Sequence, residues 1–234
     1  MDIEEMRKKF DPNKHILDIS QWHTPATDYP EVQIGNFRIH HSKYYRGMYK
    51  NWGLDGYLYF NVKEPLPIVE LQEKRGGKWY DWMIDDPPNY RAMQIYAEYA
   101  SGKVLTTGLG LGLFIHELAK NPKVTEVTVV EKHPTVIELV LPLLPKDLLT
   151  IIEEDFLEFI KTDTKAWDHI IVDLWVTSEK TKGIIYLSKI LPLAISLSQK
   201  YFKAKITYHG YQSISYTKPV SEEMVKLISD IGGT

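Results

Sequence analysis

The chain of 234 residues contains no cysteine. Disulfide bonds and zinc sites with thiolate ligands are therefore excluded, and the composition fits a reducing compartment. No apolar run reaches the roughly 18 residues that a membrane-spanning helix needs, and segment 1–10 lacks the apolar stretch of a signal peptide. We therefore expect a cytoplasmic protein that makes no membrane contact.

The chain also lacks an excess of charge of one sign, and its histidines lack the spacing of metal ligands. Lys and Arg number 28 against 31 Asp and Glu, for a formal net charge of −3. Nucleic-acid-binding proteins usually carry a basic footprint, so we expect the binding partner to be a small molecule or a protein instead. His116 and Glu117 start like the zinc helix H-E-x-x-H, but Lys120 stands where the second histidine belongs. The sequence predicts no metal site.

Three glycines at alternate positions are the most informative feature that the chain does have. Gly108, Gly110 and Gly112 lie between an apolar strand around 104–105 and an amphipathic helix expected over 111–120. Glycine lets a backbone approach a ligand closely, and a helix N-terminus offers free N–H groups to an anionic group. The pattern predicts a nucleotide-type binding loop; the alternative is a strand-to-helix connection that binds nothing.

Acidic residues stand at the ends of the apolar segments that follow this loop. They are Glu131, Asp155 and Asp173. In open α/β sheets the ligand crevice lies outside the carboxyl ends of the strands, so we expect these residues to share one edge. A carboxylate at position 131 suits the two hydroxyls of a ribose; the alternative is a solvated acid at a strand end.

The order and spacing of these motifs resemble the class I S-adenosylmethionine-dependent methyltransferases, and most closely their spermidine synthase-like branch. The resemblance covers about 83–209. It rests on segments 104–112, 129–133, 154–156 and 167–173. The likeness implies an α/β fold, a Rossmann-like, doubly wound and mostly parallel sheet, with S-adenosylmethionine as cofactor. A dinucleotide is disfavoured because Leu113 replaces the third glycine of its fingerprint.

The resemblance also implies roles for individual residues. The implied cofactor-binding residues are Gly108, Gly110, Gly112, Glu131, Asp155, Phe156 and Asp173. The glycines would pass the methionine part, Glu131 would hold the ribose, and Asp155 with the Phe156 backbone would meet the adenine. Asp173 is also the catalytic candidate, because a carboxylate there can orient or deprotonate a nucleophile. Its alternative is an acid that caps the following loop.

Five further residues are candidates for substrate contact: Asp85, Tyr90, Trp175, Tyr208 and His209. Tyr208 and His209 end a strand expected over 205–209. Trp175 offers an aromatic face to a cation, unless it packs under the helix that follows. Segment 86–90 resembles the D-P-P-Y motif of amino-group methyltransferases, but its position before the glycine loop predicts a helix start with an N-cap acid instead.

Two domains are expected. Residues 1–82 would form an antiparallel β-rich appendage, with strands near 33–39, 58–62 and 68–72 and a hairpin turn at 75–78. Residues 83–234 would form the Rossmann-like, S-adenosylmethionine-binding catalytic domain. The antiparallel hairpin that usually completes this fold is missing, apart from a fragment at 213–216. A partner chain that shields this edge would make the protein a homo-oligomer.

The sequence thus predicts an S-adenosylmethionine-dependent methyltransferase that acts on an unidentified acceptor. One alternative is a spermidine synthase-like aminopropyltransferase that uses decarboxylated S-adenosylmethionine. It is disfavoured because loop 108–113 lacks the acid of that family's G-G-G-D-G-G motif and segment 85–93 lacks its histidine. The other alternative is a non-catalytic partner module, which the missing hairpin favours, as does Thr106 where many methyltransferases have an acid.

Overall fold

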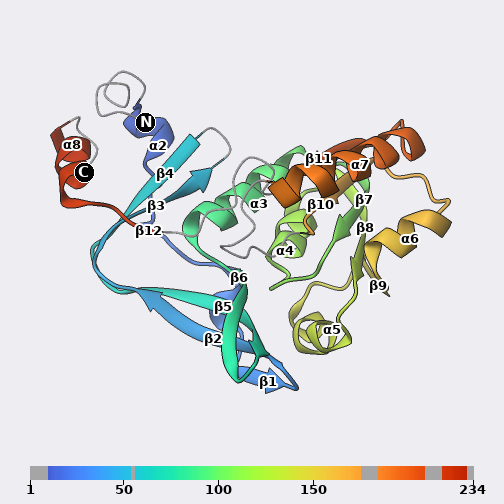
Figure 1. Cartoon of the computed structure of the whole chain (residues 1–234), viewed down its shortest axis with the longest axis horizontal. Helices are drawn as coiled ribbons and strands as arrows, with labels where there is room; N and C mark the ends of the chain where they lie inside the picture. Colours follow the sequence, from blue (N-terminus) through green and yellow to red (C-terminus); the bar gives the residue numbers. More distant parts are fainter. Residues whose placement is uncertain (1–9, 54–55, 175–183, 209–217, 231–234) are drawn as a thin grey trace.

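The computed structural model describes residues 10–53, 56–174, 184–208 and 218–230. Its largest sheet is a parallel sheet of five strands in the order β11-β10-β7-β8-β9, on the right in Figure 1. The strands are β7 (Gly102–Thr107), β8 (Val124–Glu131), β9 (Leu149–Glu153), β10 (His169–Val172) and β11 (Lys205–Tyr208). The chain runs outward from β7 to β9 and then crosses back to β10 and β11. This reversal beside β7 is the switch point of a doubly wound sheet, so the predicted fold class is confirmed.

Helices cover both faces of this sheet (Figure 1). One face carries α3 (Pro87–Tyr99), α4 (Leu113–Lys120), α5 (Pro134–Val140) and the 3₁₀-helix η2 (Leu141–Leu143), and the other carries α6 (Phe156–Thr162) and α7 (Ile184–Lys200). Neighbouring residues of β7 point to opposite faces: Val104 joins the core under α4, and Leu105 joins the core under α7. Burial on both faces explains why these strands are continuous apolar runs in the sequence.

Two antiparallel sheets are built mainly from residues that precede this domain. One has the order β1-β2-β5-β6 and the other β12-β3-β4. Their bounds are β1 (Val32–Ile34), β2 (Phe37–Tyr44), β3 (Gly47–Gly53), β4 (Gly56–Val62), β5 (Leu66–Arg75), β6 (Lys78–Ile84) and β12 (Lys218–Pro219); α2 (Pro12–His15) and η1 (Pro25–Asp28) are short helices beside them. The predicted hairpin turn is confirmed, with Gly76 and Gly77 at positive φ between β5 and β6. The strand expected over 33–39 is instead a hairpin, because Gly35, at φ +56°, reverses the chain between β1 and β2.

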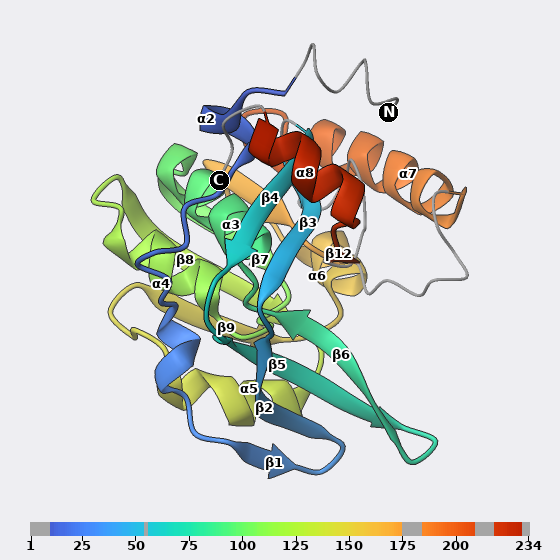
Figure 2. The same ribbon diagram turned by 90° about the vertical axis from the view of Figure 1, so that its left-hand side faces the viewer.

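The end of the described chain returns to these antiparallel sheets. Strand β12 pairs with β3, and helix α8 (Glu222–Asp230) buries Leu227 and Ile228 against Met48 and Tyr59. Figure 2 shows α8 beside β3 and β4. Segment 218–230, which the sequence analysis assigned to the Rossmann-like domain, therefore packs on the N-terminal strands, and the fragment at 213–216 lies outside the described residues. No helix within the described ranges is both long and apolar enough to cross a bilayer.

Candidate functional site

The carboxyl ends of three strands meet at one edge of the parallel sheet. A Cβ atom on Gly108, which follows β7, would lie 3.3 Å from the carbonyl oxygen of Asp173 and 4.0 Å from Oε2 of Glu131. The Asp173 N–H donates a hydrogen bond of 2.6 Å to Oγ1 of Thr107. Three residues that were predicted from separate motifs, Gly108, Glu131 and Asp173, therefore lie together at the switch point of the sheet.

Asp155 lies at the end of the adjacent strand β9. The backbone links this strand to β8, since the Glu154 N–H donates to the Glu131 carbonyl at 3.1 Å. Oδ1 of Asp155 accepts the Leu157 N–H at 2.8 Å and so caps α6. The side chain of Phe156 is buried in the core under α6 and α7. Asp155 is therefore an exposed helix cap on the same sheet edge as Glu131.

All three loop glycines have backbone conformations that favour glycine, with φ of +72° at Gly108, +51° at Gly110 and +71° at Gly112. Two of them face side chains of the protein itself. A Cβ atom on Gly110 would lie 2.3 Å from Sδ of Met83, and one on Gly112 would lie 2.2 Å from Cδ2 of Leu144. Packing within the protein thus accounts for Gly110 and Gly112, and Gly108 is the loop glycine that faces the strand-end site.

The Glu131 side chain holds the glycine loop to the end of β8. It is only 4% exposed. Oε2 accepts the Leu109 N–H and Oε1 accepts the His133 N–H, each at 2.8 Å. A carboxylate has about four acceptor sites, so each oxygen still has room for one more donor. Glu131 therefore has a structural role in the loop, whatever else it binds.

Asp85 and Tyr90 are enclosed at the junction between the N-terminal strands and the helices. Asp85 accepts hydrogen bonds from the Thr24 hydroxyl at 2.5 Å and the Val69 N–H at 2.7 Å, and its side chain is fully buried. The Tyr90 hydroxyl donates to Glu117 of α4 at 2.5 Å. The polar atoms of both residues thus bind protein groups, and their contact with a substrate stays a prediction.

The predicted helix start at this junction is confirmed. Asp86 caps α3 by accepting the Asn89 N–H on its side chain at 3.0 Å, and two prolines occupy the first turn. Asp86 and the prolines thus serve as a helix start, which was the alternative to a D-P-P-Y motif.

Asp85 makes the folded state sensitive to pH. Burial raises the pKa of its carboxyl from 3.8 to about 6. An acid with a raised pKa holds its proton more tightly in the folded chain, so its stabilising effect is complete below about pH 4 and is lost as the pH rises through 6. We expect the free energy of unfolding of the wild type to fall by about 2–3 kcal/mol relative to Asp85→Asn between pH 4 and 7.

Urea unfolding of both proteins across this pH range measures the difference. Burial, and then the charge of Asp81, also raise the pKa of Glu70, to about 7. Glu70 is present in both proteins, and the charge of Asp85 is the smallest cause of its shift, so most of its contribution cancels. Asp147→Asn, a change at an exposed carboxyl, is the control. Its free energy of unfolding should vary with pH as that of the wild type does. Parallel curves for the wild type and Asp85→Asn would contradict the prediction.

The last strand contributes Tyr208 to the same edge. Tyr208 pairs in register with Val172, the residue before Asp173, and its hydroxyl is buried without a hydrogen-bond partner among the described residues. Trp175 and His209 lie outside the described residues. A buried hydroxyl without a partner at this edge is a polar group that a ligand can satisfy.

Tyr96 of α3 is a neighbour of Asp173 that the sequence analysis missed. Burial, and then the negative charge of Asp173, raise the pKa of the Tyr96 hydroxyl to about 12. Its phenol therefore stays protonated at neutral pH and can donate a hydrogen bond. Its helical position gives no signal in the sequence, because only the tertiary fold brings α3 within electrostatic reach of Asp173.

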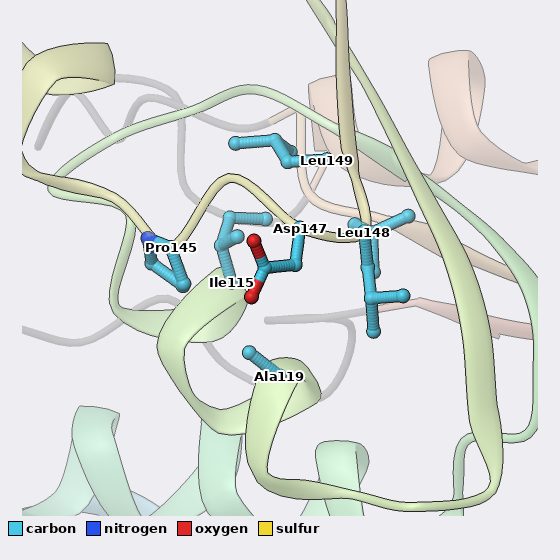
Figure 3. A pocket seen from close by; sticks show the side chains of 7 residues that line it. Ile115, Ala119, Pro145, Asp147, Leu148 and Leu149 are labelled. Carbon is cyan, nitrogen blue, oxygen red and sulfur yellow. The ribbon is translucent and has the colours of Figure 1, made fainter.

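The opposite end of the sheet carries two surface pockets. The first, of about 390 Å³, lies between α4 and the loop before β9, with Ile115, Ala119 and Leu149 on its wall and the Asp147 carboxylate turned into it (Figure 3). The second, of about 340 Å³, shares Leu149. Leu149 begins β9, so both pockets lie away from the carboxyl ends of the strands. A cluster of three or more metal-binding side chains is absent from the described part of the chain.

Comparisons with known proteins find similarity to solved structures only. No family model and no curated protein matches the chain. A structure of the Haloferax volcanii Trm112 methyltransferase activator with a proposed methyltransferase matches at 16% identity and a TM-score of 0.31, over 36% of this chain and 37% of that one. Spermidine synthase from Thermotoga maritima matches at 16% identity and a TM-score of 0.36, over 58% of this chain and 57% of that one.

Precorrin 8w decarboxylase from Methanobacterium thermoautotrophicum matches at 17% identity and a TM-score of 0.36, over 61% of this chain and 70% of that one. The match spans less than two thirds of the length of the first two proteins. This likeness assigns neither a branch nor an activity.

Proposed function

We propose that the chain binds S-adenosylmethionine at the strand-end site and transfers a methyl group from it to an acceptor. The observation that carries this proposal is the meeting of Gly108 with Asp173 and Glu131 at the switch point, where open α/β sheets bind their ligands. Leu113, in place of the third dinucleotide glycine, favours the adenosyl cofactor over NAD.

Several features of the site fit such a cofactor. Gly108 presents no side chain, Glu131 retains acceptor sites for ribose hydroxyls, and the Tyr208 hydroxyl is buried without a partner among the described residues. Asp155, exposed on the same edge, would accept from the adenine amino group. The surroundings of Gly110 do not fit as they stand, because Met83 covers that glycine.

For methyl transfer, the main task of the protein is to align the acceptor with the cofactor. The cofactor supplies a sulfonium-activated methyl group that is ready for in-line displacement. Positioning two reactants correctly contributes about 7–11 kcal/mol to lowering such a barrier. Asp173 would orient the acceptor and take its proton, within electrostatic reach of the protonated Tyr96 phenol.

A second candidate is a methyltransferase-fold module that binds a partner protein and catalyses nothing. Two contacts that the loop already makes within the protein favour this candidate. Glu131 accepts two backbone N–H groups, and Met83 covers Gly110. An aminopropyltransferase remains the third candidate, on the sequence resemblance alone.

Calorimetric titration of the purified protein with S-adenosylmethionine, its decarboxylated form and NAD separates these candidates. We expect S-adenosylmethionine to bind most tightly, because a methyltransferase site also uses the carboxylate. Preference for the decarboxylated form would favour aminopropyl transfer, and binding of none of the three would favour the partner module.

Asp173→Asn tests the catalytic assignment. We expect its affinity for S-adenosylmethionine to stay within about twofold of the wild type. Transfer of labelled methyl to a panel of small amines and alcohols should fall by about 100-fold, as expected on loss of a general base. Asp168→Asn, a change near the opposite end of β10, is the control, and equal transfer by wild type and Asp173→Asn would remove the assignment.

A further inference from the structure

The glycine loop is covered by one side chain from the antiparallel sheet. Sδ of Met83, near the end of β6, accepts the Leu111 N–H at 3.0 Å. The same sulfur lies 2.3 Å from the position of a Cβ atom on Gly110, and Cγ and Cε lie 3.7 Å from it. The thioether therefore occupies the space beside Gly110 that a ligand following the loop backbone would need.

This contact is the weakest of those that hold the loop. Gly108 donates to the Val130 carbonyl, Leu109 donates to the Glu131 carboxylate, and Gly112 donates to the Leu109 carbonyl, all at 2.8–2.9 Å. The Leu111 N–H, by contrast, donates to the sulfur of Met83. A thioether is a weak acceptor, whereas a carboxylate accepts an N–H about twice as strongly as a neutral group does. An incoming carboxylate would thus outcompete Met83 for the Leu111 N–H.

A β-bulge aims Met83 at the loop. Leu71 is opposite Met83 and Gln72 is opposite Asp81, so Trp82 is an extra residue in β6. Because side chains alternate along a strand, this extra residue puts Met83 on the same buried face as Leu71. Trp82 itself packs against Phe37, with ring centroids 5.4 Å apart. The bulge is therefore anchored, while the methionine side chain beyond it has three rotatable bonds and can move.

We propose that Met83 is a displaceable plug of the glycine loop. It holds the Leu111 N–H until the carboxylate of the ligand's methionine part replaces the sulfur and the side chain turns away. This inference rests on the proposed function and deepens it, because it names the ligand group that opens the site and the residue that opposes binding. Only the unplugged molecules bind at once, so the affinity of the wild type for S-adenosylmethionine is the affinity of the open site multiplied by the unplugged fraction.

The test is titration of S-adenosylmethionine into the wild type, Met83→Ala and Met48→Ala. Met48 is a buried methionine on β3 that packs against α8, and it serves as the matched control. We expect Met83→Ala to bind about tenfold more tightly than the wild type, because no plug competes with the ligand. The decarboxylated ligand should bind Met83→Ala less tightly than S-adenosylmethionine does, since it has no carboxylate to take the Leu111 N–H. Met48→Ala should bind like the wild type.

Hydrogen exchange at the Leu111 amide gives a readout that needs no ligand. We expect this amide to exchange at least about tenfold faster in Met83→Ala than in the wild type, because its acceptor has gone. Unchanged exchange would overturn the plug. Equal affinity of wild type and Met83→Ala would also overturn the plug while leaving the proposed function intact. Absence of binding to both proteins, with the exchange difference present, would instead overturn the proposed function and the ligand-opened plug that rests on it.

Discussion

Gly112→Ala lowers the free energy of unfolding by about 3 kcal/mol, through backbone strain and overpacking together. Gly112 has φ +71°, a conformation that costs an alanine about 1 kcal/mol or more. The new methyl group would also lie 2.2 Å from Cδ2 of Leu144 and 3.2 Å from Cγ1 of Val140, in a fully buried place. Urea unfolding followed by circular dichroism measures the loss.

Gly77→Ala separates the two contributions. Gly77 has a comparable φ of +81°, but nothing lies within 4 Å of the position of its Cβ atom. We therefore expect the strain alone there, about 1 kcal/mol. Equal losses at the two positions would mean that Leu144 and Val140 yield easily, and that Gly112 is there for its backbone conformation and not for close packing.

Glu131→Ala is expected to reduce both stability and cofactor binding. The variant leaves the N–H groups of Leu109 and His133 without their acceptor in a buried place. Each such loss costs about 1–3 kcal/mol, so the free energy of unfolding should fall by about 3 kcal/mol in total. Loss of the ribose contacts should weaken binding of S-adenosylmethionine by at least about 100-fold, which corresponds to about 3 kcal/mol.

Glu153→Ala is the matched control, because Glu153 is the exposed residue opposite Glu131 on β9. Surface changes of this kind are usually within about 0.5 kcal/mol. Unfolding and calorimetric titration of both variants then distinguish the two roles of Glu131. A loss of stability with unchanged affinity would leave Glu131 as a loop support only and would remove the ribose assignment.

Most of the parallel sheet was predictable because its signals are local. Strands buried on both faces are apolar runs, so Val104, Leu105 and their counterparts in β8 and β10 are evident in the sequence. The N-terminal strands were less predictable from the sequence. Strand β3 has no apolar run and was missed, and a two-residue turn at Gly35 was taken for the interior of a strand. Half-buried strands depend on contacts with their neighbours and therefore have weaker patterns.

The edge of the site was predictable for a different reason. In a parallel sheet, every strand ends on the same side, so an acid after each strand must lie near the others regardless of what packs around them. Gly108, Glu131 and Asp173 come together in this way. Asp85 and Tyr90 were candidates for substrate contact, and the structure buries both at the junction with the N-terminal strands, where they bind Thr24 and Glu117.

By itself the sequence determined the class of fold, the succession of strands in the parallel sheet, and the edge on which the glycine loop and the strand-end acids gather, because each follows from neighbours in the chain. Only the tertiary structure decided what covers that edge. The thioether of Met83 over Gly110, the methyl groups of Leu144 at Gly112 and the phenol of Tyr96 beside Asp173 come from segments far away in the chain. Their positions depend on how whole sheets and helices pack together, which no local pattern of residues encodes.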